Sequence, residues 1–369
     1  TNGKGRILSL VGSAGVGKHR LMVEFKERLG DRVMWITSRC AIEKRRSSYA
    51  MLVPIIQRIL NFDDSISVND LGPHLRKGLQ ALYESANQRP HRLTPSQILR
   101  YAQDDIAVGE EESTKTNWVF SIDEMVAYFK AVLLADQPLD DKIAFLPYDQ
   151  LQRQTFVAIR DVLIAAAHQK PIVLALDDLP WIDDVSKNLI TFLIDYIDDF
   201  SNTPILLLSL LHSQDWWLRD LVVKIAPEQY ESLVLEWMSL EESSAFLDYL
   251  LPGKGVPEPL KAQILRRANG NPFHLSQIVK LLLADQVLVN HNGEWLVMED
   301  VDSIFIPNTL EGVLRTRVDR LNVNAREIMQ YAAVLGAVSS LDLLRRMADF
   351  IPHLDYHLQN LQKLRLIPY

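Results

Sequence analysis

Cysteine is almost absent from this sequence of 369 residues, which contains Cys40 and no other. A single cysteine cannot form a disulfide bond within the chain, and such usage is typical of a reducing compartment. No apolar run approaches the roughly 20 residues that a membrane-spanning helix needs, and the first residues lack the apolar core of a secretory signal. These absences predict a cytoplasmic protein with no membrane partner.

Positive charge is also in deficit, because 39 Lys and Arg face 47 Asp and Glu, a formal net charge of -8. This balance argues against a general attraction to nucleic acid or to anionic membranes. With 48% hydrophobic residues the chain is globular, and its length predicts about two to four domains. The chain starts close to an apolar run and stops within a helical pattern, so we expect a fragment of a larger protein.

Apolar runs alternate with helical patterns at both ends of the first 211 residues. The runs at 6–12, 32–40, 171–178 and 203–211 each predict a strand. The continuous apolar runs at 171–178 and 203–211 are typical of central strands that are buried on both faces. Helical spacing between them, as in residues 18–29, predicts a parallel sheet with crossover helices on both faces.

The first of these predicted strands ends in a glycine-rich loop. Gly12, Gly17 and Lys18 fit the pattern G-x-x-x-x-G-K. Glycines let successive backbone N–H groups point inward around phosphate oxygens, and the following helix N-terminus adds partial positive charge. Lys18 is expected to reach the β- and γ-phosphates. The residues predicted to bind a nucleotide are Gly12, Ser13, Ala14, Gly15, Val16, Gly17, Lys18 and His19.

Two acidic residues end the predicted strand at 171–178. Asp177 is predicted to contact Mg²⁺, directly or through water, and Asp178 to orient or polarise the attacking water. An acidic pair at a strand end is weak evidence by itself. Together with the phosphate loop it predicts a nucleoside-triphosphate site of the P-loop type.

Four segments carry a resemblance to a known family: LVGSAGVGKHRLMVEF, IVLALDDLPWIDDVS, ANGNPFHLSQIVKLLLADQVLV and IPNTLEGVLRTRVDRL, in this order. Together they resemble the STAND class of signal-transduction ATPases, and within it the bacterial ATPase modules found in LuxR-type regulators and beside class III nucleotide cyclases. The resemblance implies an AAA+-like P-loop domain, a helical lid and a winged helix. It also implies that ADP holds a closed state and that exchange for ATP permits oligomerisation and effector activation.

This resemblance implies three domains. They are a P-loop nucleotide-binding domain at 1–236 with a helical insertion at about 63–148, a helical lid at 237–286, and a winged-helix-like domain at 287–369 that is cut short at its C-terminus. Within the lid, Gly270-Asn271-Pro272 would match a family motif in which the proline, Pro272, packs on the adenine. Two apolar runs around Asn292-Gly293 independently predict a β-hairpin.

Three positions depart from the family pattern. His19 stands where a Ser or Thr hydroxyl ligates Mg²⁺, a cation that prefers oxygen to imidazole nitrogen. His212 lies nearest to the position of an arginine that senses the γ-phosphate, and a neutral histidine cannot replace a guanidinium. Pro180 replaces a histidine, whereas Trp181 and Asp183 are retained. We expect ADP or ATP to bind, Mg²⁺ binding to be impaired and hydrolysis to be weak or absent.

Other conspicuous residues have structural interpretations. Trp181 is expected in the core, and the pair Trp216-Trp217 in the core or at a domain interface. Glu43–Ser48 is expected in a solvated loop, and Cys40 is expected to be an inert thiol. Arg315, Arg317 and Arg320 resemble a helix that faces nucleic acid, but Asp319 lies among them and the chain is acidic, so nucleic acid is an unexpected partner.

Three functions are therefore compatible with the sequence. The first is a regulatory adenine-nucleotide-binding module of a larger bacterial signalling protein, which controls an attached effector or a protein partner and forms homo-oligomers in one of its states. The second is a pseudo-ATPase scaffold that serves protein–protein contact. The third is a transcription regulator that contacts DNA through its winged helix.

Overall fold

The computed structural model describes residues 5–40, 49, 51–63, 65–87, 119–135, 137–196, 203–212, 216–335, 341–364 and 366–367. The basic segment Glu43–Ser48, noted in the sequence, lies outside these residues. The chain divides by its internal contacts into two compact units, Thr1–Val11 with His19–Val234 and Gly12–Lys18 with Leu235–Tyr369.

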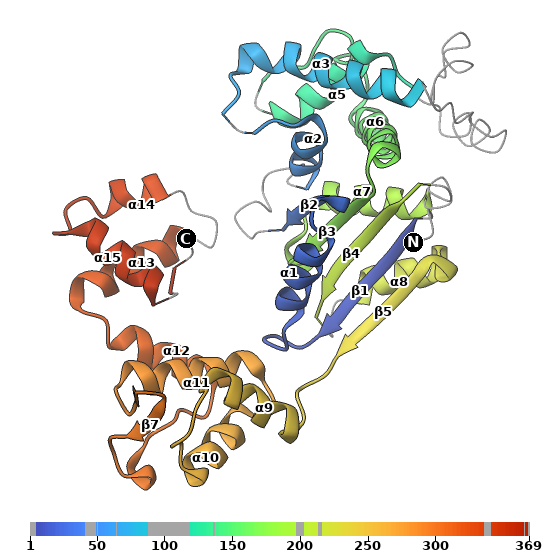
Figure 1. The fold of residues 1–369 in the computed structure, drawn as a ribbon. Helices are drawn as coiled ribbons and strands as arrows, with labels where there is room; N and C mark the ends of the chain where they lie inside the picture. Colours follow the sequence, from blue (N-terminus) through green and yellow to red (C-terminus); the bar gives the residue numbers. More distant parts are fainter. Residues whose placement is uncertain are drawn as a thin grey trace. The chain divides into compact units, whose positions relative to one another are not determined.

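A five-stranded parallel sheet forms the centre of the first unit, in the order β2-β3-β4-β1-β5 (Figure 1). The strands are β1 (Arg6–Gly12), β2 (Met34–Arg39), β3 (Ile172–Asp177), β4 (Ile205–Leu211) and β5 (Tyr230–Leu235). Since β4 lies between β1 and β3, the loop after β1, His212 after β4 and the acids that end β3 follow three neighbouring strands. All lie at the carboxyl edge of the sheet, where α/β proteins bind ligands.

Helices cover both faces of this sheet. On one face, α1 (Lys18–Leu29) packs against alternate strand residues such as Trp35. On the other face, residues such as Ile36 share a larger core with α6 (Tyr148–Gln169), α7 (Asp184–Asp195) and α8 (Trp216–Ile225). Successive strand residues point to opposite faces, so fully apolar strands need a helical layer on each side. The predicted α/β fold with helices on both faces is confirmed.

The described part of residues 63–148 is helical. With α2 (Leu52–Leu60), the helices α3 (Val68–Asn87) and α5 (Ile122–Leu133) bury apolar side chains against α6. Pro54 lies in the first turn of α2, where its missing N–H removes no helical hydrogen bond.

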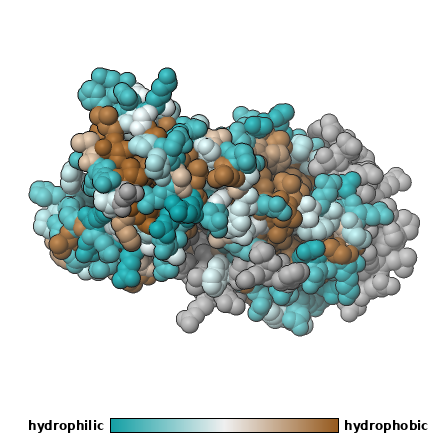
Figure 2. Space-filling view, turned by 90° about the horizontal axis from the view of Figure 1, so that it is seen from below, coloured by the Kyte–Doolittle hydropathy of each residue, from teal (hydrophilic) through white to brown (hydrophobic). Residues whose placement is uncertain are grey.

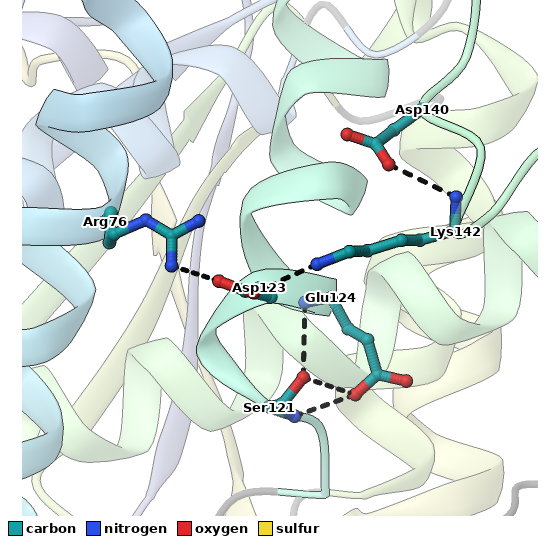
Figure 3. Close-up of polar contacts among 6 residues, drawn as sticks. All are labelled: Arg76, Ser121, Asp123, Glu124, Asp140 and Lys142. Carbon is teal, nitrogen blue, oxygen red and sulfur yellow. Dashed lines mark hydrogen bonds and ion pairs between the residues drawn. The ribbon is translucent and has the colours of Figure 1, made fainter.

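Polar contacts tie the start of α5 to its surroundings (Figure 3). The Ser121 hydroxyl accepts a bond from the Glu124 amide, and the Glu124 carboxylate accepts one from the Ser121 amide, which forms a capping box. The carboxylate of Asp123 pairs with Arg76 of α3 and, at 2.9 Å, with Lys142. These exposed ion pairs add little stability, so the apolar core carries the packing of α3 on α5.

The second unit contains two hydrophobic clusters. The first unites α9 (Leu240–Leu250), α10 (Glu258–Ala268), α11 (Pro272–Ala284), the hairpin β6 (Leu288–His291) and β7 (Glu294–Val297), and α12 (Leu310–Asp319). The second belongs to α13 (Val323–Leu335), α14 (Leu341–Met347) and α15 (Leu354–Lys363). The hairpin thus shares its core with the helices of the predicted lid, and the predicted boundary after residue 286 falls inside one cluster. The winged-helix assignment stays a prediction.

The hairpin itself follows its sequence signal. His291 pairs with Glu294, which leaves Asn292 and Gly293 as a two-residue turn. Both turn residues have positive φ angles, 52° and 88°, as a type I′ turn requires. The predicted β-hairpin is confirmed.

The tryptophan expectations are met only in part. Trp181 is 40% exposed, so its prediction as a core residue is wrong. It ends the short 3₁₀ turn Leu179–Trp181, whose first residue, Leu179, is buried in its place. Trp217 packs half-buried against the core of the first unit, and the side chain of Trp216 is outside the described part of the structure.

None of the described helices is long and apolar enough to cross a membrane. The surface in Figure 2 is mostly hydrophilic, with separate hydrophobic patches. Large exposed apolar side chains occur in both units, for example Phe145, Phe305 and Val334. Such scattered exposure is ordinary for a folded protein.

Candidate functional site

The glycine-rich loop connects β1 to α1 in a tightly curled conformation. Gly15 and Gly17 have φ angles of +83° and +111°, which side-chain-bearing residues rarely adopt. The buried Lys18 ammonium donates to the carbonyl oxygens of Gly12 at 2.7 Å and Ser13 at 3.1 Å. Because α1 begins at Lys18, the positive end of the helix dipole opens onto the loop. The loop therefore has the curvature and the charge that phosphate binding requires.

Asp177, the predicted metal ligand, is held from three sides in the first unit. Its Oδ2 lies 2.7 Å from Nε2 of His19, and its Oδ1 accepts a bond from the Asp178 amide at 3.0 Å. Its carbonyl oxygen accepts a bond from the amide of Cys40, which directly follows β2. The Asp177 side chain is 5% exposed and that of His19 is 51% exposed. Both carboxylate oxygens of this buried residue thus have partners from the protein.

Asp178 follows in a left-handed conformation, with φ of +56°. Its carbonyl oxygen accepts a bond from the Trp181 amide and so closes the turn after β3. Aspartate tolerates this region better than most residues. The half-buried Asp178 therefore leaves the strand in a different direction from Asp177.

The pKa of the Cys40 thiol is affected by burial and by the acidic residues at this edge of the sheet. Burial raises the pKa of its thiol to about 12, and the carboxylates of Asp183, Asp178 and Asp177 contribute in the same direction. The thiol therefore stays protonated at neutral pH, which makes it a poor nucleophile and a poor metal ligand. The expectation of an inert cysteine agrees with this environment.

Asp183, one of the family-like residues after β3, has a structural task. Its Oδ1 accepts a bond from the Ser186 amide at 2.9 Å and its Oδ2 accepts one from the Ser186 hydroxyl, which caps α7. The Ser186 hydroxyl oxygen in turn accepts a bond from the Met51 amide, just before α2. Asp183 thus fixes the start of two helices.

His212 directly follows β4 and is half-buried. The strand order places it beside the ends of β1 and β3. The side chain of Pro180 lies outside the described part of the structure.

In the second unit, the phosphate loop touches the start of α11. The Phe273 amide donates to the Gly15 carbonyl oxygen at 3.3 Å. Asn271 caps α11 by accepting a bond from the His274 amide, and Pro272 takes the first helical position. A Cβ atom on Gly15 would lie 2.8 Å from Oδ1 of Asn271. Gly15 therefore permits Asn271 and Phe273 to approach the loop, a contact that the sequence did not predict.

A magnesium ion does not fit the donor set of this site. Mg²⁺ requires a near-octahedral shell of oxygen ligands. The hydroxyl that would supply one is replaced by the imidazole of His19, and that imidazole already holds Asp177. Within the described ranges, no group of three or more His, Cys, Asp or Glu is placed to hold a metal ion.

Arg317 on α12 and Arg320 directly after it make internal contacts. Arg317 is buried and donates to the side chain of Gln277 and, at 2.7 Å, to the carbonyl oxygen of Leu364. Arg320 pairs with Asp285. Arg315 is exposed, with Asp319 at 3.9 Å. Two of the three arginines that resembled a nucleic-acid surface are therefore engaged within the unit.

Comparison with known proteins gives a family match over more than half of the chain. A family model described as AAA ATPase domain matches residues 1–208. No curated protein matches the sequence.

Several solved structures are similar at low identity. The Walker-type ATPase of Pyrococcus abyssi is 14% identical, with 97% of this chain and 84% of that chain covered at a TM-score of 0.37. The Orc1 protein of Aeropyrum pernix in complex with DNA is 11% identical, with 98% and 78% covered at 0.39. Drosophila ORC bound to DNA is 13% identical, with 92% and 70% covered at 0.26. These similarities concern the fold alone.

Proposed function

The chain belongs to the AAA ATPase domain family, and on that premise we propose that it is the adenine-nucleotide-binding regulatory module of a larger bacterial signalling protein. It binds ADP or ATP, hydrolyses ATP weakly or not at all, and controls an attached effector or a protein partner. The STAND-type assignment, the winged helix, the cytoplasmic location and a homo-oligomeric state are parts of this proposal.

The observation that carries the proposal is the loop of Gly12–Lys18. Its two positive-φ glycines and the buried Lys18 ammonium lie within the residues that match the AAA ATPase domain model, and they support a phosphate-binding role for this loop. Loop amides and Lys18 would hold the phosphates, and Pro272 at the start of α11 would pack on the adenine. Binding needs only these groups, whereas fast hydrolysis needs a metal and a charge clamp in addition.

Weak hydrolysis is supported by the two histidines. His19 supplies an imidazole where the metal needs a hydroxyl, and it bonds Asp177 itself. His212 is the residue nearest to the sensor position that the resemblance implies, where a permanent positive charge would stabilise the transferring phosphoryl group. Asp178 would remain as the residue that orients water.

Thermal unfolding of the full chain with and without ADP or ATP tests the proposal. Ligand that binds only the native state stabilises it by mass action, by about 2.7 kcal/mol at roughly 100 times Kd. We expect a clear rise in Tm at millimolar nucleotide. The Lys18→Ala variant should lose most of this shift, while Lys224→Ala, at an exposed lysine on α8, should keep it.

A catalytically dead scaffold is the second candidate, and the pairing of His19 with Asp177 is the observation in its favour. If Tm stays constant with every adenine nucleotide at millimolar concentration, the regulatory module is excluded and the scaffold is the better description.

A further inference from the structure

The contact between His19 and Asp177 bears on the form in which a nucleotide is bound. A buried carboxylate requires a hydrogen-bond or ionic partner, because its desolvation is otherwise uncompensated. In this chain the partner is the Nε2 atom of His19, at 2.7 Å. His19 directly follows Lys18, so the residue that holds Asp177 is joined to the phosphate loop by one peptide bond.

The second oxygen of Asp177 is also engaged, since its Oδ1 accepts a bond from the Asp178 amide. A metal ion that used this carboxylate would have to displace the imidazole, and it would then find no hydroxyl at position 19. The Asp177 side chain is nearly inaccessible, and the Cys40 amide fixes its backbone. The carboxylate therefore cannot turn outward to meet an ion elsewhere without breaking several bonds.

Resting on the proposed function, we infer that this chain binds its nucleotide free of metal, with His19 in the role that the ion would otherwise have toward Asp177. The ligand is uncomplexed ADP or ATP, and Mg²⁺ adds nothing to its affinity. The positive contributions at the phosphates are Lys18, the loop amides and the start of α1. None of these contributions depends on a divalent cation.

The inference predicts how the affinity for nucleotide depends on Mg²⁺. Mg²⁺ in solution complexes ADP and ATP and so lowers the concentration of the free nucleotide. A site that takes only the free form should therefore bind equally well or more tightly in EDTA than in excess Mg²⁺. A site that takes the magnesium–nucleotide complex should instead bind more tightly in excess Mg²⁺ than in EDTA.

Isothermal titration calorimetry of the full chain with ADP and with ATP, in EDTA and in excess MgCl₂, decides between these orders. We expect Kd in EDTA to be no higher than Kd in Mg²⁺. Binding that is about tenfold tighter with Mg²⁺ overturns the inference and leaves the proposed function standing. Absence of binding in both buffers removes the proposed function and this inference with it.

The His19→Ser variant tests the role of the imidazole. It removes the imidazole from Oδ2 of Asp177 and places a hydroxyl at position 19, so we expect it to bind nucleotide several-fold more tightly in Mg²⁺ than in EDTA. His291→Ser, at an exposed histidine of the hairpin, is the matched control and should show no such preference. If His19→Ser folds by circular dichroism and still shows no preference, His19 does not replace the ion. If it fails to fold, the comparison of buffers with the unaltered chain still decides.

Discussion

Cys40 is the only thiol in the chain and lies directly after β2, buried among the carboxylates of Asp177, Asp178 and Asp183. Burial and these charges raise its pKa from 9.0 to about 12. The thiolate fraction at pH 8 is thus lower than that of an unperturbed thiol by a factor on the order of 10³.

We expect a thiol reagent such as DTNB to react with the native chain at pH 8 at least ~10²-fold more slowly than with the unfolded chain. Stopped-flow labelling across a urea gradient measures this ratio. Equal labelling rates in both states would contradict the buried position of Cys40.

The raised pKa of Cys40 also favours the folded state below pH 9. This contribution to the free energy of unfolding should disappear as the pH rises from about 9 to 12.

Single residues of the site could be read from the sequence, but their contacts could not. His19 and Asp177 each stand out against a known pattern. Their bond joins residues 158 positions apart, and it depends on the registers of β1 beside β4 and of β4 beside β3. Trp181 was predicted wrongly for a different reason. Its aromatic side chain indicated a core residue, but the 3₁₀ turn buries Leu179 instead and leaves Trp181 exposed.

At the scale of elements, Arg317 ties three helices of the second unit together. From α12 it donates to Gln277 on α11 and to the Leu364 carbonyl at the end of α15. Burial lowers the pKa of its guanidinium, which shows that the charge is partly desolvated. Removing a buried donor leaves its acceptors unsatisfied, at a cost of about 1–3 kcal/mol.

The Arg317→Met variant retains most of the apolar stem and removes the donors. We expect its urea unfolding midpoint to fall clearly, whereas Arg315→Met, at an exposed neighbour on the same helix, should stay close to the unaltered chain. Similar midpoints for the two variants would show that the bonds of Arg317 do not stabilise the unit.

The elements differed in how well the sequence predicted them. β1, β3 and β4 are almost continuously apolar, and the Asn292-Gly293 turn has a strong local signal, so these were predicted correctly. β5 was not predicted. It lies at the edge of the sheet with four exposed residues in six, and only its pairing with β1 makes it a strand.

At the scale of the whole molecule, the net charge of -8 and the internal contacts of Arg317 and Arg320 oppose a role in DNA binding. We expect fluorescence anisotropy with labelled duplex DNA to show no binding at physiological salt. An affinity that falls steeply with salt concentration would contradict this prediction and favour the transcription regulator.

The division of the molecule was harder to predict than its fold class. Alternating strands and helices indicate a parallel sheet from local patterns alone. The sequence around the apolar residues of the hairpin, in contrast, does not indicate which helices they contact. In the structure they pack with α9–α12. Domain boundaries depend on such pairings, which a single sequence does not encode locally.

The hydrogen bond between Gly15 and Phe273 has a consequence that follows from covalent geometry. The Gly15 carbonyl and the Val16 amide belong to one peptide group, which is rigid and planar. In the structure the Gly15 carbonyl oxygen accepts a hydrogen bond from the Phe273 amide, and the Val16 amide donates one to the Ser13 carbonyl oxygen. Rotating the plane to present the amide to an incoming anion must swing the oxygen away from its partner on α11. An anion bound by the Val16 amide and the hydrogen bond from Phe273 on α11 to the Gly15 carbonyl therefore exclude each other, because both depend on the orientation of this one peptide group.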